Sequence, residues 1–315
     1  MGKKVTVFGS FVVDLMGRCP HLPAPGETVK GSVFQMGPGG KGFNQGVAAH
    51  KAGADVTMVT KLGSDAFAEV ALNTMKKIGM NSDRIFQTNE TVTGSALILV
   101  DENTAQNEIV VVLGACGNIT DEEVESLSDL LDQSEYLLTQ LETNVSAVEK
   151  IITMAYEKGV KIILNTAPIQ LISDFVLSRV DLITPNEVEA GILSGIKVDG
   201  VEGAKKAADY FFHKGVKNVL ITMGGSGVFL ATPQKRGFLP AYKVKAFDTT
   251  GAGDAFNGGL TAALSEGKDL WEAAQFANAL AAISVQRLGT TTSMPDREEI
   301  DRFVAEHGKG EWSLC

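Results

Sequence analysis

Two glycine-rich segments, each leading into a predicted helix, carry the residue types that could perform chemistry. In DTTGAGDAFNGGL at 248–260, Asp254 directly follows Gly251, Ala252 and Gly253 at the expected helix start. Successive N–H groups at a helix start bind anions, and the helix dipole assists them. A carboxylate beside them can act as a general base for a phosphoryl transfer. Asp254 can also be simply the helix N-cap, and the two roles can coexist.

The second segment, GPGGKG at 37–42, surrounds Lys41 with glycines before a predicted helix. Backbone N–H groups and a lysine ammonium suit a polar ligand, although a plain glycine-rich connection is the alternative. The segment also matches the G-x-G-x-x-G pattern, with Asp65 roughly 20 residues further on, as in dinucleotide sites. The match is weak because no strand is predicted directly before the segment. An NAD(P)-dependent oxidoreductase is therefore kept only as the alternative from a different class of enzyme.

Polar groups also lie at the ends of several predicted strands. TPNEVE begins a helix with Asn186 and Glu189 on one face, a pair that suits a hard cation such as Mg²⁺ or merely caps the helix. ITMGGSG at 221–227 ends a strand in glycines, where open α/β sheets bind ligands or where the chain turns tightly into the next strand. Asp14 and Glu142 also follow strands, and each is either a solvated carboxylate or a group in the same crevice.

The elements that must position these groups alternate along the chain. Strands are predicted at 4–8, 56–61, 136–140, 160–165, 182–184 and 218–222, and helices at 44–51, 65–78, 145–157, 187–193 and 201–213. Three more helices are predicted at 254–264, 271–287 and 296–306. The alternation predicts an α/β fold with a doubly wound, mainly parallel sheet and helices on both faces.

Two regions depart from this alternation. Residues 11–38 contain several prolines and no helical pattern, and the runs 93–100 and 107–113 flank the polar turn DENTAQ as in a hairpin. We expect these regions to form a small β-sheet outside the main one. The sheet would act as a lid, formed by about 11–38 and 92–115, on a single domain spanning residues 1–315.

Composition limits the possible partners. The 315 residues include 28 Lys and Arg against 38 Asp and Glu, for a net charge of −10, which argues against nucleic acid or an anionic membrane. The 3 cysteines are far apart and the 4 histidines lack metal-ligand spacing. Isolated cysteines fit a reducing compartment, and no apolar run approaches the roughly 18 residues of a membrane span. We therefore expect a cytoplasmic protein.

Taken together, these segments resemble the ribokinase-like (PfkB-type) family of carbohydrate kinases over nearly the whole chain. The resemblance is carried by GGKGFNQGVAAHKAGA and DTTGAGDAFNGGL, with QLE, TPNEVE and ITMGGSG between them and RLGTTTSMP after them. It implies transfer of the ATP γ-phosphoryl group to a sugar hydroxyl, with D-ribose converted to D-ribose 5-phosphate as the expected reaction. Deoxyribose, a ketose or another small polyol are alternative acceptors, and a sugar-sensing protein on an inactive kinase scaffold is a third hypothesis.

The resemblance also implies roles for residues at matching positions. Asp254 would deprotonate the hydroxyl beside an anion hole of Gly251, Ala252 and Gly253. The sugar would be held by Asp14, Gly40, Lys41, Gly42, Asn44, Glu142 and Asp254. ATP would contact Asn186, Thr222, Gly224, Gly225, Gly227, Gly253 and Asn278. Glu189 would position Mg²⁺ through water, and K⁺ would be held by oxygens, mostly backbone carbonyls, of Asp248, Thr250, Ser284, Arg287, Gly289 and Ser293.

Two further expectations follow from the family. The lid would also form the interface of a homodimer. Val12 stands where ribokinase-like enzymes often have Asn, so an amide is missing from the expected sugar pocket, and Pro38 and Phe43 are also less usual. A lost amide would remove a hydrogen bond worth about 1 kcal/mol to one sugar hydroxyl.

Overall fold

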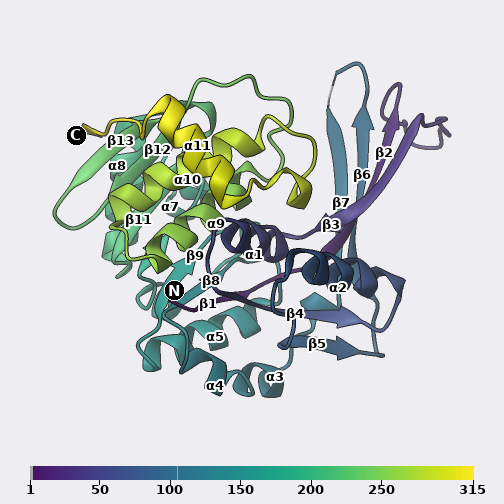
Figure 1. The fold of residues 1–315 in the computed structure, drawn as a ribbon, viewed down its shortest axis with the longest axis horizontal. Helices are drawn as coiled ribbons and strands as arrows, with labels where there is room; N and C mark the ends of the chain where they lie inside the picture. The colour runs from purple at the N-terminus through teal and green to yellow at the C-terminus, as the bar shows by residue number, and fades with distance from the viewer. Residues whose placement is uncertain (1–2, 105) are drawn as a thin grey trace.

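A ten-stranded sheet forms the centre of the main body, in the order β14-β13-β12-β11-β10-β9-β8-β1-β4-β5 (Figure 1). The computed structural model describes residues 3–104 and 106–315. The strands from β11 to β5 pair in parallel, and β12, β13 and β14 add an antiparallel edge. The strands are β1 (Val5–Phe8), β4 (Val56–Gly63), β5 (Ile85–Thr88), β8 (Tyr136–Thr139), β9 (Lys161–Leu164), β10 (Leu182–Ile183), β11 (Asn218–Thr222), β12 (Gly227–Ala231), β13 (Arg236–Pro240) and β14 (Ser313–Leu314).

Helices cover both faces of this sheet because its buried strands present apolar side chains to each side. Leu137 packs into one core and its neighbour Leu138 into the other. One face carries α1 (Lys41–Lys51), α2 (Ala66–Ile78), α9 (Ala252–Ser265), α10 (Leu270–Ser284) and α11 (Arg297–His307). The other carries α3 (Asp121–Glu125), α4 (Ser128–Leu131), α5 (Val145–Glu157), α6 (Asp174–Leu177), α7 (Glu187–Ser194) and α8 (Val201–His213). The predicted doubly wound, mainly parallel α/β fold is confirmed.

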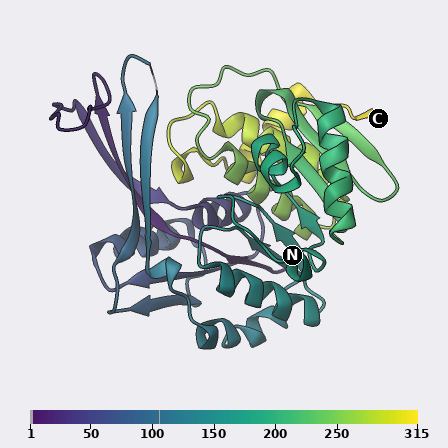
Figure 2. The ribbon, with the colours of Figure 1, turned by 180° about the vertical axis from the view of Figure 1, so that it is seen from behind.

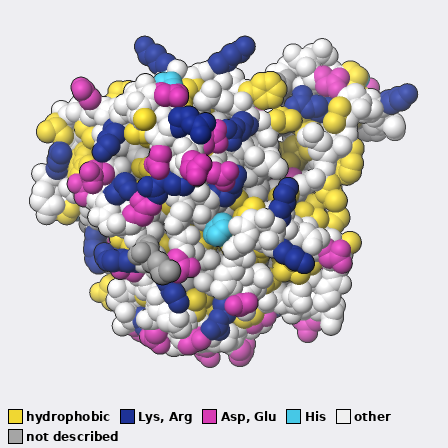
Figure 3. All heavy atoms as spheres, viewed as in Figure 1, with side chains coloured by type: hydrophobic (Ala, Val, Ile, Leu, Met, Phe, Trp, Pro, Cys, Tyr) yellow, Lys and Arg dark blue, Asp and Glu magenta, His cyan; other side chains and the backbone are white. Residues whose placement is uncertain are grey.

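A second sheet stands away from the main body, as both ribbon views show (Figures 1 and 2). Its order is β3 (Val33–Gly39), β2 (Val12–Cys19), β6 (Thr93–Asp101) and β7 (Asn107–Gly114). We call these four strands the small sheet. Hydrophobic side chains gather along it, at the right of the space-filling view (Figure 3). The predicted small sheet is confirmed, whereas its action as a lid stays a prediction.

The connections of the small sheet correct one expectation. The first three residues of GPGGKG are the end of β3, which runs directly into α1, so a strand does lead into the turn. That strand belongs to the small sheet and pairs antiparallel with β2, so it does not form the parallel βαβ unit of a dinucleotide site. The segment was missed as a strand because Gly37, Pro38 and Gly39 have low strand propensity.

The predicted helices are all present, with shifted ends. Four of the helices are followed by glycines in the left-handed region, Gly53, Gly79, Gly159 and Gly215, with φ angles between 70° and 105°. Three short 3₁₀ turns complete the fold: η1 (Ala115–Gly117), η2 (Gly224–Ser226) and η3 (Thr291–Ser293). Within the described ranges, no helix combines the length and the apolar character needed to cross a membrane.

Candidate active site

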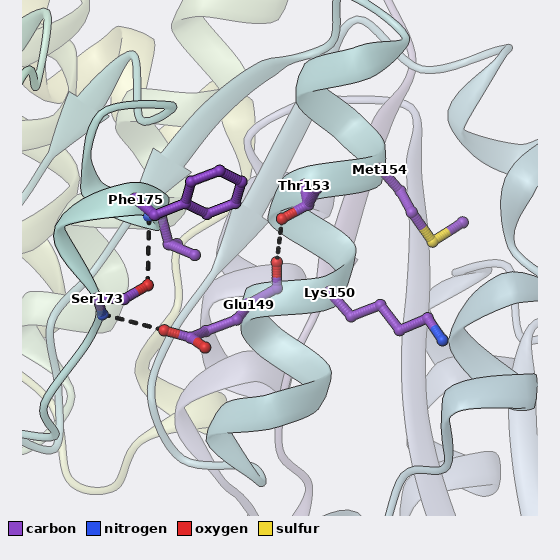
Figure 4. Close-up of a pocket in the computed structure, with 7 residues that line it drawn as sticks. Glu149, Lys150, Thr153, Met154, Ser173 and Phe175 are labelled. Carbon is purple, nitrogen blue, oxygen red and sulfur yellow. Dashed lines mark hydrogen bonds between the residues drawn. The ribbon is translucent and has the colours of Figure 1, made fainter.

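Asp254 and the residues predicted to hold the sugar gather where the small sheet meets α1 and α9. A cleft of about 480 Å³ lies between the small sheet and two loops of the main body. Asp14, Asp248, Thr250, Gly289 and Thr290 are among the residues that line it. A smaller hollow of about 350 Å³ lies between α5 and the start of α6, lined by residues such as Glu149, Lys150 and Phe175 (Figure 4). No predicted site residue lines that hollow, so the cleft is the candidate site.

Asp254 is the third residue of α9, not its N-cap. The N-cap is Gly251, whose φ of 75° turns the chain into the helix without a side-chain cap. The expectation that Asp254 caps the helix is therefore wrong, because the left-handed turn at Gly251 starts the helix before Asp254 is reached. The segment that leads into Gly251 is a loop. The carboxylate is consequently free for another role.

Two neighbouring amides on α1 hold the Asp254 carboxylate. Asn44 Nδ2 donates to Asp254 Oδ2 at 3.1 Å, and Gln45 Nε2 donates to Asp254 Oδ1 at 2.9 Å. The Asp254 side chain is buried, with 7% of the residue exposed. Packing of α1 against α9 thus fixes the carboxylate in a buried position, and Asp254 is not among the residues that line the cleft.

Burial raises the pKa of Asp254 above its ordinary value, against the opposing effects of the Lys41 charge and of the Gln45 and Asn44 amides. Burial also disfavours the charged Lys41, but the carboxylates of Asp254, Glu142 and Glu189 outweigh it and raise the Lys41 pKa. Lys41 therefore remains cationic, and its charge favours the ionised form of the buried carboxylate. A carboxylate with a raised pKa is suited to accept a proton from a hydroxyl.

Two further carboxylates lie near Asp254. Asp14, on β2, has its pKa raised to about 6, first by burial and then by the charges of Glu142 and Asp254, while a hydrogen bond from Thr290 opposes the rise. Glu142 accepts hydrogen bonds from Ser10 Oγ at 2.6 Å and from the Lys41 backbone N–H at 2.8 Å. The sequence analysis left both groups open to being solvated, yet Glu142 is only 9% exposed. Three carboxylates and one lysine make a site suited to a ligand rich in hydroxyl groups.

The glycines of GGKG are required by close packing. A Cβ at Gly42 would lie 2.6 Å from backbone atoms of Gly9 and Ser10, and one at Gly40 would lie 2.9 Å from the backbone of Val12. The N–H groups at the start of α1 are already bonded: that of Gly42 to Ser10 Oγ and that of the next residue to the Ser10 carbonyl. This turn therefore brings α1 against the β1–β2 connection, and the Lys41 ammonium is the group it offers to a ligand.

The first turn of α9 offers unpaired donors instead. Among the described residues, the N–H groups of Gly251, Gly253 and Asp254 have no acceptor, whereas that of Ala252 donates to the Thr249 carbonyl at 3.2 Å. A Cβ at Gly253 would meet nothing within 4 Å, so its backbone is open to the site. The predicted anion hole thus has free N–H groups at Gly251 and Gly253, but the Ala252 N–H closes the turn.

Six of the seven residues predicted to contact ATP are connected by a chain of contacts, whereas Gly253 belongs to the first turn of α9. Asn186 forms a β-bridge with Thr222, and the Ala241 N–H donates to the Ser226 carbonyl of η2. Asn278 Nδ2 donates to the Pro240 carbonyl at 3.0 Å, beside that contact. In this way Asn186, Thr222, Gly224, Gly225, Gly227 and Asn278 are connected. Gly227 has φ of 131°, and a Cβ there would lie 2.0 Å from the Leu239 carbonyl, so glycine is needed for the hairpin itself.

TPNEVE forms a complete capping box. Asn186 Oδ1 accepts from the N–H groups of Val188 and Glu189, and Glu189 Oε2 accepts from the Asn186 N–H at 3.0 Å. Glu189 Oε2 also accepts from Thr166 Oγ1 at 3.2 Å. Because its oxygens already have donors, Glu189 fits an Mg²⁺ ion held through water better than one bound directly.

Most of the predicted K⁺ ligands lie on two loops that Asp248 joins, whereas Ser284 is the last residue of α10. Asp248 Oδ1 accepts from the Thr250 N–H at 2.9 Å, and Asp248 Oδ2 accepts from the Gly289 N–H at 3.0 Å. Ser293 Oγ donates to the Thr290 carbonyl at 2.7 Å, while the Arg287 guanidinium pairs with Glu299 and the Arg287 N–H donates to the Ser284 carbonyl. Carbonyl and carboxylate oxygens are the donors that such a hard cation prefers, so the loops fit a K⁺ ion. No group of three or more His, Cys, Asp or Glu residues in 3–104 and 106–315 could form a metal site.

Val12, Pro38 and Phe43 take three different positions. Val12 lies on the same face of β2 as Asp14, opposite Gly39 and Gly94, and is 3% exposed. Pro38 lines the cleft. Phe43 is fully buried against another core phenylalanine, with ring centroids 4.9 Å apart, so it belongs to the core.

Several site residues were missed from the sequence: Ser10, Gln45, Asn165, Thr290 and Thr291. Thr291 Oγ1 donates to Asn44 Oδ1 at 2.6 Å, and Thr290 Oγ1 contacts Asp14 Oδ2 at 3.4 Å. Gln45 and the two threonines lie inside the segments GGKGFNQ and RLGTTTSMP, which were singled out as wholes. Their roles depend on contacts between segments about 250 residues apart, and no local pattern signals such contacts.

Comparisons with known proteins agree with this geometry. The family model described as "pfkB family carbohydrate kinase" matches residues 2–297. The chain is 41% identical over 307 residues to a ribokinase of Haemophilus influenzae, covering 98% of this chain and 100% of that protein. It is 33% identical over 302 residues to a deoxyribokinase of Salmonella typhi, covering 96% of this chain and 98% of that protein. The solved structure of Arabidopsis thaliana ribokinase complexed with ribose and ATP matches with a TM-score of 0.89 and 29% identity, covering 96% of this chain and 99% of that one.

These matches extend over nearly the whole chain and include the small sheet. A dinucleotide-dependent oxidoreductase built on GPGGKG is not supported, because the N–H groups of that turn bind protein acceptors. The buried carboxylate, the free donors at the start of α9 and the matched family model point to the same chemistry. The chain belongs to the pfkB family of carbohydrate kinases and is an enzyme that transfers a phosphoryl group to an alcohol.

Proposed function

We propose that this enzyme phosphorylates D-ribose with ATP, giving D-ribose 5-phosphate and ADP. The observation that carries the proposal is the Asp254 carboxylate, buried and held by two amides next to the free N–H groups that begin α9. Ribokinases that are 35% to 41% identical over nearly the whole chain support ribose as the acceptor. ATP is supported by the related structure that contains ribose and ATP.

In this proposal, Asp254 takes the proton of the acceptor hydroxyl as its oxygen attacks the γ-phosphorus. The N–H groups of Gly251 and Gly253 stabilise the charge on the transferring group. Asp14 and Glu142 accept hydrogen bonds from other hydroxyls and orient the sugar. Lys41 keeps Asp254 ionised in the buried site. The small sheet would exclude water that otherwise competes for the phosphoryl group.

Two ions belong to the proposal. Mg²⁺ would lie near Glu189 and reach it through water, and it would neutralise charge on the phosphates. K⁺ would be bound by Asp248, Thr250, Ser284, Arg287, Gly289 and Ser293. Replacing K⁺ by a bulky ammonium ion should lower the rate, and equal rates in both salts would remove K⁺ from the proposal.

A second candidate acceptor is 2-deoxy-D-ribose. Val12 offers no hydrogen-bonding group on the face of β2 that carries Asp14, so a sugar lacking one hydroxyl loses nothing there. Relatives named deoxyribokinase, 33% identical to this chain, support this candidate too.

The test is ADP release from ATP, with Mg²⁺ and K⁺ present, over a panel of D-ribose, 2-deoxy-D-ribose, D-fructose and several polyols. The Asp254→Asn variant is run beside the wild type as the blank. Selective release with D-ribose is the expected result. Selective release with another sugar would replace ribose as the acceptor, and no sugar-dependent release would favour a sensing protein on an inactive scaffold.

A homodimer through the small sheet also belongs to the proposal. Phe34, Leu97, Val110 and Val112 are each at least 50% exposed on this sheet. An exposed apolar face of this kind commonly marks a protein interface. The cytoplasmic location of the protein stays a prediction.

A further inference from the structure

Gln45 is a fully buried side chain with a complete set of partners. Its Nε2 donates to Asp254 Oδ1 at 2.9 Å and to Asn165 Oδ1 at 3.0 Å, and its Oε1 accepts from Gln140 Nε2 at 2.7 Å. A buried amide that loses one such partner leaves a polar group unpaired, which is costly. The Gln45 amide is therefore held in place on three sides.

A backbone carbonyl fixes the orientation of this amide. Asn165 Nδ2 donates to the Thr184 carbonyl at 2.8 Å, and a carbonyl can only accept. Asn165 must therefore present its oxygen to Gln45, and Gln45 must present its NH₂ group to both Asn165 and Asp254. Consequently Asp254 Oδ1 always faces a donor, whether or not the carboxyl group is protonated.

The other oxygen of Asp254, Oδ2, faces Asn44, whose side-chain amide can turn over to present either its NH₂ group or its oxygen. Asn44 Nδ2 donates to Asp254 Oδ2, and Asn44 Oδ1 faces the hydroxyl of Thr291. That hydroxyl lies 3.0 Å from the Pro38 carbonyl as well, so it can donate to Pro38 and accept from Asn44. With the Asn44 amide turned over, its oxygen would accept a proton carried on Asp254 Oδ2.

We infer that Gln45 is a positioning residue that reserves Asp254 Oδ1 as an acceptor and so directs the proton of the acceptor hydroxyl to Asp254 Oδ2. The inference rests on the proposed role of Asp254 as the base. In the step, the hydroxyl O–H bond breaks and the proton moves to Oδ2. The hydroxyl oxygen forms a bond to the γ-phosphorus, and the bond from that phosphorus to the bridging oxygen breaks to release ADP.

The inference predicts a specific change in Gln45→Met, a substitution of similar size without a donor. Loss of the hydrogen bond to Oδ1 removes a group that favours the ionised carboxylate, so the pKa of Asp254 rises. We expect kcat to fall roughly 10- to 100-fold, because the carboxylate is no longer held. The acid limb of the kcat profile should move up by about one pH unit, with little change in the sugar KM.

The charged groups facing Asp254 are Lys41 on α1, Glu142 after β8 and Asp14 on β2. None of these groups changes in Gln45→Met, so a shift in the acid limb of the kcat profile is caused by the loss of the Gln45 amide. The profile of kcat is used because it reports the sugar-bound enzyme. In kcat/KM, Asp14, whose pKa is about 6 in the free protein, would overlap the signal.

Gln140→Met is the matched control, because it removes a buried amide from the same network without touching Asp254. Its acid limb should stay in place. Asn165→Leu is the second test, since it removes the anchor that orients Gln45, and it should move the limb in the same direction as Gln45→Met. It also tests the inference if Gln45→Met fails to fold.

All variants are assayed with the better acceptor of D-ribose and 2-deoxy-D-ribose, with Asp254→Asn in parallel. A Gln45→Met enzyme with wild-type kcat and an unmoved limb, beside an inactive Asp254→Asn, overturns the inference alone. An equal shift in Gln140→Met overturns it too, because the effect would then be general to the network. An active Asp254→Asn enzyme instead overturns the role of Asp254 in the proposed function.

Discussion

At the scale of single residues, burial disfavours the ionised carboxylate of both Asp14 and Asp254, but the groups that stabilise the ionised form differ between the two. Both carboxyls have raised pKa values. Asp254 has two amide donors and the charge of Lys41 to support its ionised form. Among the described residues, Asp14 has a hydrogen bond only from the Thr290 hydroxyl, at 3.4 Å. We therefore expect substitution of Asp254 to change the reaction rate, and substitution of Asp14 to change sugar binding and the free energy of unfolding.

Asp254→Asn should lower kcat by at least about 10²-fold, because an amide cannot take a proton. The fold should survive, since Gly251 starts the helix and no cap is lost. Asn44, next to the adjustable Thr291 hydroxyl, can also turn its amide to match the new NH₂ group. Steady-state rates and a thermal melt check this. A variant that melts early but keeps its rate after refolding would assign Asp254 a purely structural role.

The pKa of Asp14, about 6, predicts a pH dependence of sugar binding. The ionised carboxylate accepts hydrogen bonds from hydroxyls, so the KM for the sugar should rise as the pH falls below about 6. Measured KM values between pH 5 and 8 test this, and Asp14→Asn should abolish the dependence. A KM that stays flat over this range in the wild type would contradict the assignment.

The same shift predicts how Asp14 affects stability. Between pH 3.8 and about 6 the native state binds more protons than the unfolded chain, so the free energy of unfolding falls as pH rises through this window. At pH 7, Asp14→Asn should therefore stabilise the apo protein, by on the order of 2 to 3 kcal/mol. Below pH 3.8 the gain should disappear. Urea unfolding at pH 7 and pH 3.5 measures both values, and a less stable variant at pH 7 would contradict the prediction.

At the scale of elements, the first turn of α9 combines two glycines with opposite requirements. Gly251 has φ of 75°, which favours glycine, whereas Gly253 is helical with open space around its Cβ position. One glycine therefore serves the fold, and the other keeps space for a ligand.

Gly253→Ala should keep or slightly raise stability and yet impair the reaction. Alanine suits the helix better by about 1 kcal/mol, but its methyl group would occupy the space where the phosphoryl group is expected. We expect kcat/KM for ATP to fall about tenfold or more with an unchanged or slightly raised Tm. Gly251→Ala is the contrasting variant, and it should lower stability by about 1 to 2 kcal/mol. An active Gly253→Ala enzyme would show that this position lies outside the anion hole.

The same elements show how far local sequence patterns extend. The strands β1, β4, β8 and β11 and the long helices could be predicted because their apolar periodicity is strong and glycines end several of them. The short elements α4, α6 and β14 have four residues or fewer, too few to show a period. Asp254 was identified by its segment, but its position inside the helix depended on the backbone at Gly251. Gln45 could not be predicted, because its partners come from the ends of two separate strands, β8 and β9, and from α9.

At the scale of the whole molecule, the small sheet has two faces with different neighbours. Ile98 and Ile109 are paired across β6 and β7 and line the cleft. Leu97 and Val110 are also paired and point to the opposite face, where they are 50% and 59% exposed. Around Leu97 and Val110 this outer face is apolar and exposed, so the proposed homodimer assigns the cover of this part to a second copy.

The double variant Leu97→Lys, Val110→Lys should therefore be monomeric. Two lysines opposite each other on the outer face put charge into a surface that association would bury, and unpaired buried charges are strongly unfavourable. Light scattering with size-exclusion chromatography should give twice the chain mass for the wild type and the chain mass for the variant, with unchanged circular dichroism. Leu171→Lys is the control, because Leu171 is 90% exposed but lies outside the small sheet, and it should leave the dimer intact. A wild-type protein that is monomeric at every concentration, or a double variant that stays dimeric, would remove the small sheet as the interface.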